Sequence, residues 1–289
     1  MRRFFPRRRE VVIDPVEKVA RVNLHAPCGV VRVDVPTITM EEDGRVVSDP
    51  ERPVAFISSP VFASGVDVEV HIPKEKRWPE LELAGRKSVV VDACFGGTFY
   101  AIISAQELGF PGGLRKGKVD LDAIGRAVKS LKSHLVEAPK FAACIKHPTT
   151  PDLSFLYSVM VVDHKVGVVP EGSDGAETGL CYFADHQIDR SPTGSCVVAR
   201  MALAYAKGLR KPGQRWTYHS LVSNAFAGNG GFTASIVEEV EIAGGEGIKA
   251  NGVLVRVEGQ AYYTGSSTFI VEEDDPISVK GFSMKGVCS

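Results

Sequence analysis

The stretch that decides the fold reads Phe183-Ala184-Asp185-His186-Gln187-Ile188-Asp189-Arg190-Ser191-Pro192-Thr193-Gly194-Ser195, and it joins an apolar run to a polar loop and a helical pattern. Ser191 is a favoured N-cap residue, and Pro192 suits the first helical position because it has no N–H group to leave unpaired. The N–H groups of Thr193, Gly194 and Ser195 then fall in the first turn, where they have no intrahelical acceptor. The segment therefore predicts a strand, a loop and a helix start, in this order.

This helix start predicts an anion site with a carboxylate beside it. Unpaired N–H groups and the helix dipole attract a carboxylate or phosphate, and Gly194 lets a ligand approach the backbone closely. Asp189, just upstream, can hold a positive group of the same ligand. Together these features suit an amino acid as the ligand. The alternative is an ordinary helix cap, with Asp189 and Arg190 forming a surface ion pair.

The same segment resembles the second active-site motif of the proline racemase family, in which a strand, Asp-Arg-Ser-Pro and a helix start follow one another. The family includes proline racemase, hydroxyproline 2-epimerase and trans-3-hydroxy-L-proline dehydratase. The similarity runs from about Val11 to about Lys285, and further family motifs have counterparts, in the same order, at residues 20–29, 91–101, 153–157 and 259–265.

The resemblance implies which residues act on a substrate. Racemases and epimerases have a catalytic Cys after Ser-Pro, whereas this chain has Thr193 there, as dehydratases do. We therefore expect Thr193 at the catalytic position, and Asp189, Gly194, Ser195 and Phe183 as substrate-binding residues. No metal and no cofactor are expected.

The principal base of the family is the cysteine of a Met-Cys-Gly-His motif, which does not occur in this chain. We therefore expect one wall of the active site to be present and the other to be lacking. Cys196 is a candidate substitute base, although a cysteine one turn into a helix is usually a small buried apolar residue.

The expected function is that of a dehydratase-like lyase, which removes water from trans-3-hydroxy-L-proline to give pyrroline-2-carboxylate. One alternative is a non-catalytic binder of proline-type ligands or a truncated product of the family. A proline racemase or hydroxyproline epimerase is the third choice, because both expected catalytic cysteines are absent.

The pattern of short strands and few helices predicts a mixed α/β (α+β) fold. Strands are expected within 19–35, 54–57, 66–72, 88–104, 155–163 and 180–184, and again between 215 and 271, and helices at 120–138 and 193–207. The resemblance implies a diaminopimelate epimerase-like fold, with two pseudo-symmetric lobes of curled, mostly antiparallel sheet around a central helix and the first lobe incomplete. The expected parts are a basic, disordered tail (1–10), a main lobe with its central helix near 192–207 (11–271), and a C-terminal segment contributing to the first lobe (272–289).

The composition of the chain indicates which classes of partner to expect. The 289-residue chain is 44% apolar with a net charge of −1, so it can bury a large core, and neither nucleic acid nor a membrane is expected as a partner. Its six cysteines occur singly, without Cys-x-x-Cys spacing, which suits a reducing compartment, by default the cytoplasm. The expected partner is a small molecule of the hydroxyproline or proline type, and a homodimer is left open.

Overall fold

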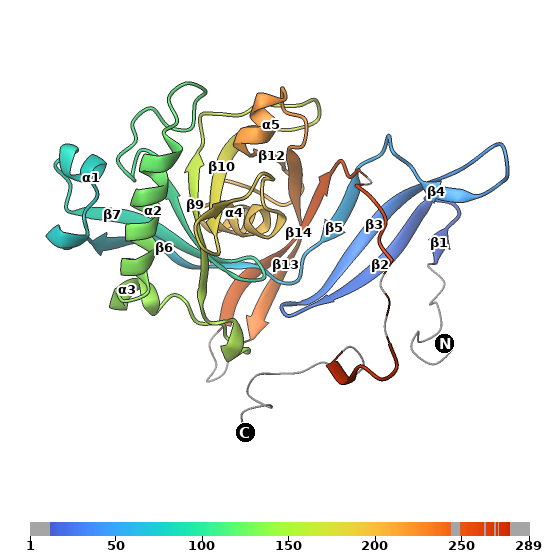
Figure 1. Ribbon diagram of the computed structural model, residues 1–289, viewed down its shortest axis with the longest axis horizontal. Coiled ribbons are helices and arrows are strands. Elements are labelled where there is room, and N and C mark those ends of the chain that lie inside the picture. The colour runs from blue at the N-terminus through green and yellow to red at the C-terminus, as the bar shows by residue number, and fades with distance from the viewer. Residues whose placement is uncertain (1–11, 244–248, 263, 269, 271, 278–289) are drawn as a thin grey trace.

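A computed structural model describes residues 12–243, 249–262, 264–268, 270 and 272–277. A single mixed sheet connects the strands of this part of the chain (Figure 1). Its strands are β1 (Ile13–Asp14), β2 (Val19–Ala26), β3 (Gly29–Thr39), β4 (Val46–Ser48), β5 (Val54–Ile57), β6 (Phe62–His71), β7 (Ser88–Phe95), β8 (Phe99–Ser104), β9 (Leu156–Asp163), β10 (Ala176–Phe183), β11 (Gln187–Ile188), β12 (Arg215–His219), β13 (Phe232–Ala243) and β14 (Lys249–Gly259). The helices are α1 (Pro79–Leu83), α2 (Leu121–Leu135), α3 (Pro139–Ala142), α4 (Gly194–Ala206) and α5 (Leu221–Ala225).

The sheet closes around α4. Its strands follow the order β14-β13-β12-β10-β9-β8-β7-β6, antiparallel except for the parallel pairs β8–β9 and β10–β12. Val61, just before β6, exchanges backbone hydrogen bonds of 3.0 and 2.9 Å with Val253 in β14, which brings the two ends of this order together. Figure 1 shows α4 inside the curve of these strands. The expected curled sheet around a central helix is thus confirmed.

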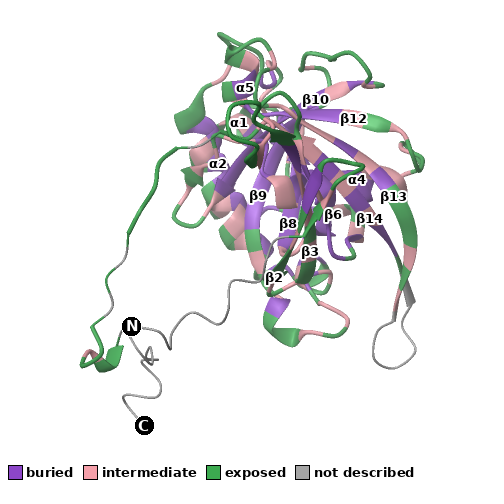
Figure 2. Ribbon diagram, turned by 90° about the vertical axis from the view of Figure 1, so that its right-hand side faces the viewer, coloured by how far each residue is buried: buried purple, intermediate pink, exposed green. Residues whose placement is uncertain are grey.

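The sequence of α4 explains its central position. Eight consecutive residues are buried, from Cys196 to Leu203, so the helix has no solvent-facing stripe in this stretch. A helix that is apolar on all sides is stable only when it is surrounded by protein. The one charged residue in the run, Arg200, is 3% exposed and pairs with Glu177 of β10. Figure 2 shows the buried residues concentrated on α4 and the strands around it.

The outer face of the closed sheet is covered by α2. Asp120 caps this helix by accepting a 2.9 Å hydrogen bond from the N–H of Ala123. Its apolar face, which includes Ile124 and Leu131, packs in one cluster with Val159 and Leu180 of the neighbouring strands. Strands β9 and β10 therefore have helices on both faces, which accounts for their nearly continuous runs of buried residues. The predicted helix at 120–138 is confirmed.

A second group of strands extends away from the closed sheet. Residues 12–57 form β1–β5 and no helix, and they join the rest through β5, which pairs with β14. The expectation of a continuous strand over 19–35 is wrong, because the chain folds back at a two-residue turn, Pro27-Cys28, into the hairpin β2–β3. Pro27 has no N–H group for the ladder, and Gly29 adopts φ +119 directly after the turn.

The C-terminal third contains one element that the sequence did not predict. Ser220 starts the short helix α5 through a capping box with Ser223, where only strands and turns were expected. Residues 260–262 form no strand after β14. The glycine-rich turn at 244–247, the basic tail at 1–10 and residues 278–289 lie outside the described residues, so the division into domains stays a prediction.

Candidate active site

A tight hairpin places the predicted motif. After β10 the chain turns through Ala184 and His186, both at positive φ, and returns as β11 against the end of β10. The N–H of Asp189 donates a 3.0 Å hydrogen bond to the carbonyl of Cys181. The turn thus carries Asp189 back to the sheet, next to the start of α4.

Asp189 organises the loop that enters α4. Its Oδ1 accepts 2.9 Å hydrogen bonds from the N–H and the hydroxyl of Ser191, and its Oδ2 accepts a 2.7 Å hydrogen bond from the hydroxyl of Thr193. The hydroxyl of Ser191 in turn accepts a 3.1 Å hydrogen bond from the N–H of Thr193. Side-chain turns of this kind compete with helix formation. The expected N-cap at Ser191 is therefore wrong, since the helix starts two residues later.

Thr193 is the N-cap of α4 and has φ 63, ψ 90, an unusual conformation for a β-branched residue. The carbonyl of Thr193 accepts the first helical hydrogen bond, 2.8 Å from the N–H of Val197. In the first turn of α4, the amides of Gly194, Ser195 and Cys196 consequently have no acceptor among the described residues. This corrects the expected set by one position, because the Thr193 amide is already bound to Ser191.

A cavity of about 240 Å³ opens at this helix start. It brings together all the site residues expected from the sequence, Phe183, Asp189, Thr193, Gly194 and Ser195, and adds the side chains Tyr100, Tyr157 and Cys181. A second cavity of about 490 Å³ shares several of these residues and extends toward the inner face of β2, β3 and β5. The amino end of α4 therefore faces open space bounded by two parts of the fold.

The hairpin β7–β8 fixes the position of the helix start. The hydroxyl groups of Tyr100 and Ser195 lie 2.6 Å apart and share a hydrogen bond. Gly96, in the turn of the hairpin, passes so close to α4 that a Cβ atom there would lie 2.0 Å from the carbonyl oxygen of Ser195. Burial raises the pKa of Tyr100 well above its ordinary value, so its hydroxyl keeps its proton and serves as a hydrogen-bonding group.

Two cysteines lie near the helix start, and neither is a ready thiolate. Cys181 lines the cavity and was not among the expected site residues. It lies in β10, two residues before Phe183, and the β10–β11 hairpin brings it next to Asp189. Cys196 is fully buried in a cluster with Cys94 and Met160. Burial raises the pKa of both Cys181 and Cys196, which keeps both as thiols at neutral pH.

Comparisons with known proteins show the family of the chain. The sequence profile of the proline racemase family matches residues 10–283. The chain belongs to the proline racemase family. It is 38% identical to the human trans-3-hydroxy-L-proline dehydratase over 92% of its own length and 63% of the human protein, and 30% identical to the proline racemase of Clostridioides difficile over 95% and 68%. The chain thus spans about 63% of the length of curated dehydratases to which it is similar.

Solved structures confirm the fold. A probable proline racemase from Agrobacterium radiobacter K84 aligns with a TM-score of 0.65 and 23% identity, covering 95% of this chain and 67% of its own. A hydroxyproline epimerase from Agrobacterium vitis, solved with bound trans-4-hydroxy-L-proline, aligns with a TM-score of 0.61 and 22% identity, covering 88% and 60%. The fold is therefore the diaminopimelate epimerase-like fold expected from the sequence.

Among the described residues, no group of three or more His, Cys, Asp or Glu side chains is arranged to hold a metal ion. In the same part of the chain, no helix has the length and apolar character needed to cross a bilayer.

Proposed function

We propose that the protein is a trans-3-hydroxy-L-proline dehydratase, and that its substrate binds in the cavity at the start of α4. The proposal rests on one observation. The unpaired amides of Gly194 and Ser195 and the carboxylate of Asp189 line the same cavity, next to Thr193. The identity to several curated dehydratases supports it.

In the proposed complex the substrate carboxylate accepts hydrogen bonds from the amides of Gly194 and Ser195. These amides point into the cavity from the positive end of the helix dipole. The ring ammonium of the substrate lies against Asp189, whose two oxygens accept three hydrogen bonds from the loop and so are held in place. A cavity of about 240 Å³ suits one small ring such as that of hydroxyproline.

The anion site contributes to chemistry as well as to binding. When a base removes the α-proton, negative charge spreads onto the substrate carboxylate, and preorganised amides stabilise that charge. The electron pair of the broken C–H bond forms the C2=C3 double bond while the C3–O bond breaks, and the hydroxyl leaves as water after taking up a proton. The resulting enamine rearranges to pyrroline-2-carboxylate.

Thr193 favours this elimination over racemisation. Racemisation needs an acid that returns a proton to the opposite face of the α-carbon. A threonine hydroxyl is a weak acid, and that of Thr193 already donates to Asp189 at 2.7 Å. Cleavage of the C3–O bond is then the open route for the carbanion-like intermediate.

The dehydration needs a base that accepts the α-proton. Cys181 lines the cavity, but burial raises its pKa and keeps it protonated. The Met-Cys-Gly-His motif that supplies the base by resemblance does not occur in this sequence. This observation favours a second candidate function, a binder of proline-type ligands that does not turn them over.

Turnover of trans-3-hydroxy-L-proline by the purified chain separates the two candidates. Pyrroline-2-carboxylate is measured by mass spectrometry, and binding is measured in parallel by calorimetry. Formation of product that persists in a Cys196→Ala variant supports the dehydratase and excludes Cys196 as the base. Binding without product supports the binder.

An Asp189→Asn variant tests the site itself, with Asp185→Asn as the matched control because Asp185 is exposed on the same turn. Loss of binding in the first variant alone supports the proposed pose. Equal affinity in both variants, or no binding by the folded wild-type chain, contradicts it.

A further inference from the structure

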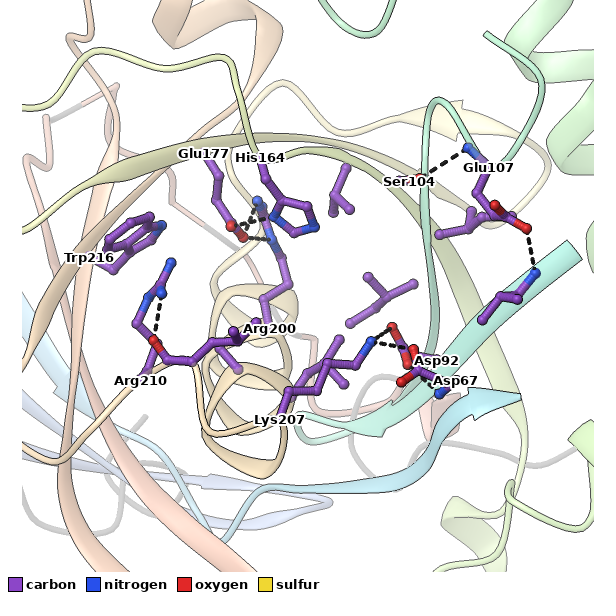
Figure 3. A pocket seen from close by; sticks show the side chains of 17 residues that line it. Asp67, Asp92, Ser104, Glu107, His164, Glu177, Arg200, Lys207, Arg210 and Trp216 are labelled. Atoms are coloured by element: carbon purple, nitrogen blue, oxygen red, sulfur yellow. Dashed lines mark hydrogen bonds and ion pairs between the residues drawn. The ribbon is translucent and has the colours of Figure 1, made fainter. Parts of the chain in front are cut away.

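A larger cavity of about 550 Å³ lies at the carboxyl end of α4. Leu203 and Lys207 at the end of the helix line it, together with residues of the surrounding strands (Figure 3). With a rise of about 1.5 Å per residue, the length of α4 places this cavity roughly 20 Å from the proposed substrate site. The proposed function does not use it.

The carboxylates in the wall of this cavity all have partners. Asp67 and Asp92 each accept a 2.8 Å hydrogen bond from the Lys207 ammonium. Glu107 pairs with Arg86 and also accepts a 2.8 Å hydrogen bond from the N–H of Val90. These acidic groups therefore offer little to an additional cation.

The buried carboxylate of Glu177, with its partners Arg200 and His164, forms the adjoining wall. Oε1 of Glu177 accepts a 2.9 Å hydrogen bond from Nε of Arg200, and Oε2 lies 2.7 Å from Nδ1 of His164. Burial opposes ionisation of Glu177, but Arg200 and His164 outweigh it and lower the pKa of this carboxyl to about 2. Glu177 is thus an anion whose oxygens are already used, and Figure 3 shows the three side chains meeting at the edge of the cavity.

The unused hydrogen-bonding groups of this wall are donors. Arg210 pairs with no carboxylate in the described part of the chain. Its Nη1 donates a 2.7 Å hydrogen bond to the carbonyl of Leu209, and its guanidinium carbon lies 3.2 Å from the ring centroid of Trp216. The Nε of Arg210, the indole N–H of Trp216 and Nη1 of Arg200 are buried without an acceptor in the described structure. Buried donors of this kind cost free energy until an acceptor reaches them. One cavity wall thus combines an unpaired positive charge with unsatisfied donors.

The rest of the wall is mainly apolar. Ile102, Val162 and Leu203 supply it, and the indole of Trp216 adds an aromatic edge. At about 550 Å³ the cavity is more than twice as large as the proposed substrate site of about 240 Å³. An apolar pocket with a few polar groups is typical of sites for small organic molecules.

We propose that this cavity binds a small organic carboxylate with an apolar body, larger than proline. The carboxylate of the ligand pairs with the Arg210 guanidinium and accepts a hydrogen bond from the indole N–H of Trp216. The apolar body of the ligand packs on Leu203 and Ile102. Because Nε of Arg210 and the indole nitrogen of Trp216 are both buried, the Arg210 side chain has to move away from the indole ring when the ligand enters. Binding should therefore change the fluorescence of Trp216.

The test uses the full chain, with 4-phenylbutyrate as the probe and 4-phenylbutanamide, which has the same body without the charge, as the ligand control. Affinity is measured by calorimetry, and tryptophan emission is followed in the same titration. Arg210→Gln is the site variant. Arg115→Gln, at an exposed arginine in a loop, is its matched control. Trp216→Phe removes only the indole donor.

We expect saturable binding of 4-phenylbutyrate with a change in emission. Loss of one charged hydrogen-bonding partner should weaken binding about tenfold, both for the amide and for Arg210→Gln. Trp216→Phe should weaken binding of both ligands, because the carbonyl oxygen of the amide also accepts a hydrogen bond from the indole N–H, and Arg115→Gln should match the wild type.

The proposal would be overturned by the absence of saturable binding to the folded wild type, by equal affinity for carboxylate and amide, or by equal affinity of Arg210→Gln and wild type. Competition by trans-3-hydroxy-L-proline would also overturn it, because the probe would then occupy the proposed substrate site. The proposal stands or falls independently of turnover.

Discussion

Replacing Gly96 with alanine tests whether the hairpin β7–β8 sets the position of α4. The new Cβ atom would lie 2.0 Å from the carbonyl oxygen of Ser195 and 2.9 Å from the Cβ of Ala199, and contacts below 3.0 Å are essentially never observed. Backbone atoms on both sides have to separate by about 1 Å, since no flexible side chain can give way. Overpacking of this kind destabilises a protein by about 1–3 kcal/mol.

The same substitution at Gly125 is the matched control. Gly125 lies inside α2, and a Cβ atom there would make an ordinary 3.5 Å contact with the ring of Tyr182. Alanine is favoured over glycine inside a helix by about 0.5–1 kcal/mol, so Gly125→Ala should stabilise the protein. The same change from glycine to alanine is thus expected to lower the free energy of unfolding at position 96 and to raise it at position 125.

Urea unfolding gives the free energies of unfolding, with the slope m used to check that the transition is comparable among variants. Because the Gly96→Ala strain falls on the carbonyl of Ser195, the variant should also bind trans-3-hydroxy-L-proline more weakly. A Gly96→Ala variant as stable as the wild type, with unchanged affinity, would refute the inference that close contact of the hairpin fixes the start of α4.

Three further predictions concern single groups. Asp189→Asn, compared with Asp185→Asn, should lower the free energy of unfolding by about 1–3 kcal/mol in urea unfolding, because donors of the loop lose a charged acceptor; equal stability of the two variants would contradict this. Tyr100→Phe should weaken calorimetric binding of trans-3-hydroxy-L-proline severalfold by releasing the hydroxyl of Ser195, and unchanged affinity would rule out this positioning role. The pKa of Glu177 is about 2 in the folded protein, below its ordinary value of 4.5, so its ionisation stabilises the fold above about pH 5, and this contribution is lost as the pH falls toward 2. Urea unfolding between pH 7 and pH 3 checks this. Glu177→Gln should be about 3–5 kcal/mol less stable than the wild type at pH 7, and its free energy of unfolding should depend less on pH. An unchanged pH dependence of the free energy of unfolding in this variant would disprove the assignment.

The local pattern of the sequence was enough to predict the main elements. The helix at 120–138 has a clear apolar face, and the glycines at 96 and 97 mark the turn between two strands. Residues 183–195 were sufficient to predict a strand, a loop and a helix start, and the structure places Asp189, Thr193, Gly194 and Ser195 around one cavity. These features depend on neighbours in the chain, so spacing and residue type reveal them.

Other features depend on which of several competing hydrogen bonds forms and on the path that the chain takes at a turn. The exact start of α4 was missed because the hydrogen bonds of Asp189 to Ser191 and Thr193 outcompete a simple serine cap. Cys181 was overlooked as a cavity residue because its place beside Asp189 is set by the turn between β10 and β11, which the sequence pattern did not predict.

By itself, the sequence determined the secondary structure around the motif, the apolar character of α4 and the chemistry available at its start, since each is a property of a short segment. Only the tertiary structure decided that the sheet closes around α4 through Val61 and Val253, and that the cavity of about 550 Å³ opens at the carboxyl end of α4. The donors of Arg200, Arg210 and Trp216 become unsatisfied only when folding removes them from water together. Burial is a property of the whole fold, and the spacing of residues along a chain does not carry it.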